Sequence, residues 1–278
     1  MTDFALEASD LWFWYGAQDP PVLAGVDLAV RSGQFVALVG ANGSGKTTLV
    51  KHFVGLLRPQ RGQVRVAGQD AACRSVGELA RQVGFLFQHP EQQIFSATVR
   101  QEVAFGPRNL GLSPAQAEER VEAALSRFGL EAEADRPPAI LSYGLRRRVT
   151  LASLAAMDSP VLVLDEPTVG LDASGLEETF AWLAELHSRG RTIVLVTHDM
   201  ALAAARAGRV VVLHQGQVIA DGQPAEIFRR PDLVTRASLA LPPVMELAQA
   251  LLPWGMRGDI LTVESFCREF LDKARGPA

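Results

Sequence analysis

Apolar residues recur along this chain with two spacings, one typical of buried strands and the other of helices. Apolar clusters or alternations over residues 22–39, 161–164 and 192–197 predict strands. Val210 to Val218 reads as a hairpin, because Gln215-Gly216 interrupts its apolar run with a turn dipeptide. Long segments separate most of these predicted strands, and these segments must link one strand to the next.

Helical patterns fill those segments. Residues 46–57, 99–157 and 174–189 are compatible with helices. Ser113, followed by a proline and Gln116, has the pattern of an N-cap with a capping box. Strands that alternate with helices predict an α/β fold whose mainly parallel sheet is covered on both faces. The helix that starts after Ser113 has apolar positions at helical spacing and a closing glycine: Ala117, Val121, Ala124, Leu125, Phe128 and Gly129.

Composition narrows the class of protein. The chain has 278 residues, 48% hydrophobic and 21% charged, which is ordinary for a folded protein. Its net charge of −4 argues against a broad nucleic-acid surface. Two cysteines build no disulfide framework and suit a reducing compartment. The acidic start lacks the order of a signal peptide, and no apolar run of membrane-spanning length occurs, so a partner would have to hold the chain at any membrane.

A glycine-rich segment after the first strands matches the phosphate-loop pattern G-x-x-x-x-G-K-[ST]. Glycines let successive backbone N–H groups turn toward phosphate oxygens at a helix N-terminus. The bland alternative is a tight turn, but the segment follows a strand and opens a helix, as phosphate binding requires. The residues expected to bind a nucleotide here are Gly40, Asn42, Gly43, Ser44, Gly45, Lys46, Thr47 and Thr48.

A second chemical signal is a pair of carboxylates, Asp165 and Glu166, directly behind the strand over 161–164. In a phosphate-loop ATPase, such a strand end holds Mg²⁺ and positions the attacking water. Asp165 would serve the metal and Glu166 would polarise the water. Taken alone, the pattern also fits a strand that runs into a turn; the phosphate loop favours the functional interpretation.

The segment 141–145, Leu-Ser-Tyr-Gly-Leu, resembles the ABC signature, usually L-S-G-G-Q. Other family marks occur in the proper order over about residues 5–228. Gln88 resembles the Q-loop glutamine, Asp172 after Gly-Leu the D-loop aspartate, and His198 the switch histidine. Tyr15 resembles the aromatic residue that stacks on adenine, although core packing of this ring in an aromatic strand is an equal alternative.

This resemblance implies an ABC-type ATP-binding subunit that hydrolyses ATP with Mg²⁺. Its fold would combine a mainly parallel core sheet, an antiparallel β portion, an inserted helical subdomain over about 89–158 and a C-terminal helical extension. The ATP-binding domain would span 1–229 and the extension 230–278. The resemblance assigns Glu166, His198 and Gln88 to catalysis, and Thr47, Gln88 and Asp165 to the metal. Ser142 and Gly144 would act on the nucleotide of an opposite subunit in a head-to-tail dimer, and Asp172 would be the D-loop aspartate.

The signature departs from the family pattern at two positions. Tyr143 replaces the first glycine and Leu145 replaces the glutamine, which puts any ribose contact of that glutamine in doubt. The tyrosine is tolerable only if its side chain is directed away from the nucleotide. The three arginines at 146–148 could suggest an anion site, but a solvated helix face is the preferred interpretation.

The segments 83–95 and 103–111 look like those of ATPases in energy-coupling-factor importers, which take up vitamins or transition-metal ions such as cobalt and nickel. The partners implied are a second ATPase subunit, identical or related, a transmembrane scaffold and a substrate-binding membrane protein, at the cytoplasmic face of the cell membrane. Residues 89–96 would dock the scaffold, unless Ile94 and Phe95 are core residues. The tail would help the subunits dimerise, or fold back on its own domain, through Val263, Phe266, Phe270 and Leu271.

Three alternatives stay open on the residues alone. A conventional ABC importer ATPase would use the same catalytic residues. A soluble ABC ATPase acting on nucleic acid would typically bring a second cassette, a coiled-coil insertion or a basic stripe, none of which is visible. A small-molecule kinase with a phosphate loop would not require Ser142, Asp172 and His198 in this order.

Overall fold

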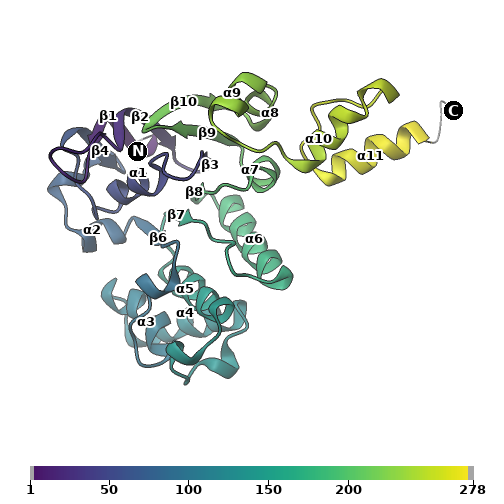
Figure 1. Cartoon of the computed structure of the whole chain (residues 1–278). Helices are drawn as coiled ribbons and strands as arrows, with labels where there is room; N and C mark the ends of the chain where they lie inside the picture. The colour runs from purple at the N-terminus through teal and green to yellow at the C-terminus, as the bar shows by residue number, and fades with distance from the viewer. Residues whose placement is uncertain (1–2, 275–278) are drawn as a thin grey trace.

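A six-stranded sheet forms the centre of the computed structural model, which describes residues 3–274 (Figure 1). Its strand order is β10-β9-β3-β8-β7-β6, and every neighbouring pair is parallel except β9 with β10. The carboxyl ends of five strands therefore meet at one edge, where ligands bind in α/β sheets. The strands are β3 (Phe35–Val39), β6 (Val83–Leu86), β7 (Val161–Asp165), β8 (Thr192–Val196), β9 (Arg209–His214) and β10 (Gln217–Gly222).

A second, antiparallel sheet has the order β2-β1-β4-β5. Its apolar residues share one buried cluster with the central sheet and with α1 (Lys46–Phe53). The predicted helix to Leu57 was too long, because Gly55 takes a left-handed conformation (φ 71°) that ends helices. The strands are β1 (Phe4–Phe13), β2 (Leu23–Arg31), β4 (Arg61–Val66) and β5 (Gln69–Asp70).

Three helices, α3 (Val99–Asn109), α4 (Pro114–Arg127) and α5 (Tyr143–Met157), pack together beside the carboxyl edge of β6 and β7 (Figure 1). The capping box predicted at Ser113 is confirmed, with Gln116 as its partner. The remaining helices of the main body are α2 (Val76–Ala80), α6 (Ala173–Ser188), α7 (Met200–Arg206) and α8 (Pro224–Phe228), with 3₁₀ turns η1 (Ala71–Cys73), η2 (Pro90–Gln92), η3 (Glu131–Glu133) and η4 (Pro138–Ile140).

The C-terminal segment is helical, as predicted, and α10 and α11 stand away from the two sheets (Figure 1). It has a small core of its own around Met256 and Ile260. Leu233 and Met245 nevertheless belong to the core of the main body, so the domain boundary at 229 stays a prediction. Within residues 3–274, none of the helices combines the length and hydropathy that crossing a membrane requires. The elements are α9 (Pro231–Arg236), α10 (Pro243–Ala250), η5 (Leu252–Trp254) and α11 (Val263–Ala274).

Candidate functional site

The phosphate loop connects the carboxyl end of β3 to α1 and depends on glycine conformations. Gly40, Gly43 and Gly45 all have positive φ, and a Cβ on Gly40 would lie 2.1 Å from the carbonyl oxygen of Leu213. Gly45 is the N-cap of α1, and no side chain of the described residues caps this helix. The first-turn N–H groups are therefore suited to an external anion, which the helix dipole also favours.

Lys46 is held over this loop. Its Nζ donates to the carbonyl oxygens of Gly40 at 2.8 Å and Ala41 at 3.0 Å. Burial lowers the pKa of Lys46, while the negative charges of Glu166 and Asp165 oppose that shift. The side chain thus places a cation against the loop, in the same cavity as two carboxylates.

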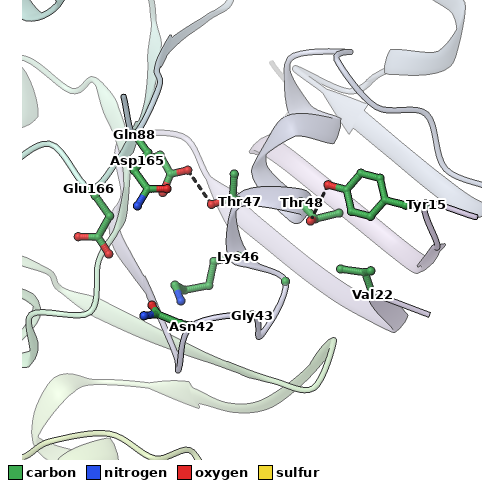
Figure 2. Close-up of a pocket in the computed structure, with 11 residues that line it drawn as sticks. Tyr15, Val22, Asn42, Gly43, Lys46, Thr47, Thr48, Gln88, Asp165 and Glu166 are labelled. Carbon is green, nitrogen blue, oxygen red and sulfur yellow. Dashed lines mark hydrogen bonds between the residues drawn. The ribbon is translucent and has the colours of Figure 1, made fainter. Parts of the chain in front are cut away.

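Thr47 and Asp165 meet across the cavity (Figure 2). The Thr47 hydroxyl donates to Asp165 Oδ2 at 2.7 Å. Asp165 ends the buried strand β7, and burial raises the pKa of its carboxyl despite the Thr47 hydrogen bond. Gln88, which follows β6, lines the same cavity. Hydroxyl, carboxylate and amide oxygens are the donors that a hard cation such as Mg²⁺ prefers, so these three residues fit that metal.

Glu166 and His198 form the second polar contact of the site. Both the backbone N–H and the Nδ1 of His198 lie within hydrogen-bond distance of Glu166 Oε1, at 3.0 Å and 2.7 Å. Glu166 is buried and has a left-handed backbone (φ 49°), an unusual conformation for a glutamate. The contact therefore fixes one oxygen of a carboxylate whose backbone is itself strained.

The cavity that Lys46, Thr47, Gln88, Asp165 and Glu166 line has a volume of about 500 Å³. Tyr15 stands at one end, 62% exposed, and its hydroxyl lies 3.2 Å from Thr48 Oγ1. This exposure excludes core packing of the ring, and Tyr15 lies beyond the end of β1 rather than in a strand. Val22 also lines the cavity, and its sequence context offered no signal for it. The predicted site residues brought together here are Tyr15, Asn42, Gly43, Gly45, Lys46, Thr47, Thr48, Gln88, Asp165 and Glu166.

Ser142, Gly144 and Asp172 do not line this cavity. Ser142 is the N-cap of α5, and Asp172 is the N-cap of α6. A Cβ on Gly144 would lie 2.9 Å from the carbonyl oxygen of Gly170, so the signature and the D-loop are in contact. The backbone N–H of Gly175 and then Arg148 lower the pKa of Asp172. These residues form a second, separate surface around the N-termini of two helices.

The ABC transporter family model matches residues 23–169. The chain belongs to the ABC transporter family. An energy-coupling factor transporter ATP-binding protein of Methanoculleus marisnigri is 41% identical over 96% of this chain and 97% of its own length. A cobalt import ATP-binding protein of Syntrophus aciditrophicus is 40% identical over 95% of each chain. The family assignment and the prediction of a transporter ATPase are thereby confirmed.

Solved structures agree with the fold of this ABC ATPase. The structure of cbiO1 from Clostridium perfringens, part of the ABC transporter complex cbiONQ, has a TM-score of 0.72 and 33% identity, covering 90% of this chain and 96% of that one. A dimeric ATP-binding cassette in a post-hydrolysis state with ADP and Pi has a TM-score of 0.72 and 26% identity, covering 79% and 98%. The predicted fold class is confirmed, whereas the role of each site residue stays a prediction.

The expectation that residues 146–148 of this ABC ATPase form a solvated helix face was wrong. Arg147 is fully buried, and only 16% of the Arg148 side chain is exposed. Arg148 pairs with Asp172 at 3.1 Å and with Glu178 at 3.3 Å. The reason is that this turn of α5 faces the ends of β6 and β7 on one side and α6 on the other. Three consecutive arginines gave no indication that two of them would be enclosed by neighbouring elements.

Proposed function

We propose that this chain binds Mg²⁺-ATP in the cavity of Figure 2, dimerises with a second ATPase subunit and energises an importer of the energy-coupling-factor type. The observation that carries the proposal is the convergence of Lys46, the Thr47–Asp165 pair and Glu166 on one cavity. His198 lies behind Glu166 and contacts its carboxylate. Phosphoryl transfer needs positioning and charge stabilisation, and this set of residues supplies both. The relatives named for energy coupling and cobalt import support the type of transporter.

The phosphates would lie against the N-terminus of α1, with Lys46 beside them. Thr47, Asp165 and Gln88 would hold Mg²⁺, which when bound neutralises charge on the phosphate oxygens. Tyr15 would stack on the adenine, because its ring is exposed and its hydroxyl is tied to Thr48.

Glu166 would polarise the attacking water. The two contacts of His198 are to Oε1. The other carboxylate oxygen, Oε2, lies 3.5 Å from the Thr197 hydroxyl and keeps a lone pair to accept a hydrogen bond from that water. His198 would thus orient the Glu166 carboxylate and sense the terminal phosphate of the bound nucleotide. A buried glutamate directly after β7, placed to accept a hydrogen bond from water, supports a site that hydrolyses the nucleotide rather than one that only binds it.

Ser142, Gly144 and Asp172 would act on the nucleotide of the second subunit. They lie at helix N-termini, where anions are favoured, but away from the cavity of their own chain. The dimeric relative with ADP and Pi supports this assembly. The extension would add to it, because Val263, Phe270 and Leu271 of α11 are exposed. Phe266, by contrast, packs against the small core of the extension.

The membrane partner would dock at residues 89–96 and α3, which would hold the chain at the cytoplasmic face. Phe95 is 66% exposed and packs edge-to-face on the exposed Phe105, with ring centroids 4.7 Å apart. Ile94 instead packs against the main core. An exposed aromatic pair supports docking of an apolar helix. The cargo, a vitamin or a transition-metal ion, would be chosen by a substrate-binding membrane protein.

Copurification from gently solubilised native membranes tests this proposal. Mass spectrometry should find a polytopic scaffold and a small substrate-binding membrane protein, and a related ATPase where the dimer is heteromeric. A conventional permease pair would assign the chain to the ordinary ABC importers, and ribosomal or DNA partners would overturn the transport role. The Phe95→Asp variant should lose the membrane proteins but keep its ATPase activity. Leu252→Asp, which places the same charge at an exposed apolar position of the extension, is the matched control.

A further inference from the structure

Arg147 is a fully buried guanidinium on α5 that the mechanism above does not use. Its Nη1 donates to the carbonyl oxygen of Phe87 at 2.6 Å, and its Nη2 donates to the carbonyl oxygen of Glu166 and lies 3.4 Å from that of Asp165. Arginine stays charged in proteins, so its burial needs compensation by such acceptors. One side chain therefore bonds to the backbone at both strand ends that carry the site.

Two of the three carbonyl groups belong to residues that would hold Mg²⁺ or water, and the third belongs to the neighbour of such a residue. Phe87 directly precedes Gln88, and Asp165 and Glu166 are the carboxylate pair itself. β6 and β7 are parallel neighbours, so their carboxyl ends lie side by side. Leu86 and Leu164 are the last residues that these two strands pair, and the residues that follow are not joined by the β6–β7 ladder. A guanidinium reaches two such ends with separate nitrogens of one rigid planar fork, whereas an ammonium group donates from a single nitrogen on a flexible stem.

Glu166 is the residue for which this bridge matters most. Its left-handed backbone is unfavourable for a residue with a side chain and persists only when its surroundings hold it. Arg147 binds its carbonyl group from one side, and His198 binds its carboxylate from the other. The backbone and the side chain of the same glutamate are thus fixed by different elements, α5 and the loop after β8.

We propose that Arg147 is a positioning residue for ATP hydrolysis, which sets the backbone of Glu166 and of the Gln88 loop relative to the signature helix α5. This inference rests on the proposed role of Glu166. Because Ser142 is the N-cap of α5, the arginine also ties the signature to the hydrolytic site of its own chain. A displacement of about 1 Å at a catalytic carboxylate costs on the order of 100-fold in rate, so the loss of the bridge should reduce turnover and spare ATP binding.

Steady-state ATPase kinetics of Arg147→Lys and Arg147→Ala test this proposal. Arg147→Lys keeps the charge but not the fork, and its kcat should fall roughly 10- to 100-fold with KM for ATP nearly unchanged. Guanidinium at sub-denaturing concentration should restore part of the kcat of Arg147→Ala, and ammonium should not. Arg120→Lys is the matched control, because Arg120 likewise donates to a carbonyl of α5, that of Met157 at the far end of the helix. Its kcat should equal that of the wild type.

Two results would overturn the inference. Wild-type kcat in Arg147→Lys would show that the bridge does not position the site. A joint loss of thermal stability and ATP binding in both variants, without guanidinium rescue, would show that Arg147 serves only the fold. If Arg147→Lys behaves as expected while Glu166→Gln keeps near-normal turnover, the proposed role of Glu166 is wrong instead. Wild-type chain without turnover would count against the proposed function itself.

Discussion

The ring of Tyr143 lies directly against Gly170: a Cβ added to Gly170 would be 2.3 Å from Tyr143 Cδ1 and from Tyr143 Cε1. Tyr143 is the first residue of α5, where the family signature has a glycine, and Gly170 precedes α6 with a φ of 82°. The bulky residue in the signature is therefore accommodated by its own D-loop. The tyrosine ring fits at position 143 because residue 170 is a glycine without a side chain.

This pairing predicts that Gly170→Ala is destabilising. The left-handed backbone alone costs a side chain about 1–3 kcal/mol, and the contact with the Tyr143 ring adds to it. In a Tyr143→Ala background only the backbone cost should remain, giving a coupling of roughly 0.5 kcal/mol or more. Urea unfolding of the two single variants and the double variant measures this coupling; additive losses would show that the ring does not constrain residue 170.

Glu166→Gln should abolish most turnover while sparing ATP binding. Gln keeps the shape and can still accept from the His198 N–H, but it cannot take up a proton from water. Loss of general base catalysis typically reduces the rate about 10²- to 10⁴-fold. Phosphate release measures the rate and equilibrium binding of a fluorescent ATP analogue provides the control. Near-normal turnover would refute the assignment of Glu166 as the water-polarising residue.

Asp165→Asn should stabilise the metal-free protein at neutral pH, since it removes a buried charge. Burial raises the pKa of Asp165, so the carboxylate opposes folding above that raised pKa, whereas the protonated form does not. The advantage of Asn should shrink as the pH falls through the raised pKa and vanish below the ordinary aspartate pKa. Melting temperatures across this pH range test the sign. Addition of Mg²⁺-ATP should reverse the order, because the wild type keeps the metal-binding carboxylate and is stabilised more.

Tyr15→Ala should weaken ATP binding by about 1–3 kcal/mol, the usual contribution of an aromatic ring stacked on a base. Tyr15→Phe keeps the ring and loses only the contact with Thr48, so its affinity should stay close to that of the wild type. Binding titrations with ATP and with inorganic triphosphate separate the two effects. Equal losses for both ligands would show that the ring does not contact the base.

Phe270→Asp should weaken dimerisation, because it places a charge in the exposed apolar face of α11. Ser265→Asp introduces the same charge at an exposed position on the opposite side of the helix and serves as the control. Sedimentation velocity with and without ATP measures the dimer fraction. An unchanged fraction in Phe270→Asp would leave dimerisation to the nucleotide-binding surfaces alone.

Several motifs and elements of this protein could be predicted from short stretches of sequence. The phosphate loop is recognisable because glycine conformations, the lysine and the threonine must be neighbours in sequence to surround one phosphate group. The capping box at Ser113 and the hairpin at Gln215-Gly216 were predictable for the same reason: each is formed within a few residues. The strand that ends in Asp165 was readable because a fully buried strand is a continuous apolar run.

Contacts between distant segments were decided only in the tertiary structure. Burial of Arg147 follows from the meeting of α5 with the ends of β6 and β7, and three consecutive arginines read as a solvated face until that packing is known. The exposure of Tyr15 and the pairing of Tyr143 with Gly170 likewise depend on segments that are distant in sequence. The sequence by itself predicted the nucleotide-binding chemistry and the class of fold, because both can be inferred from the spacing of motif residues and the local periodicity of apolar residues. Whether a given charged side chain or ring is buried was decided only by the tertiary structure, because burial depends on which segments pack around a residue and not on the residue type.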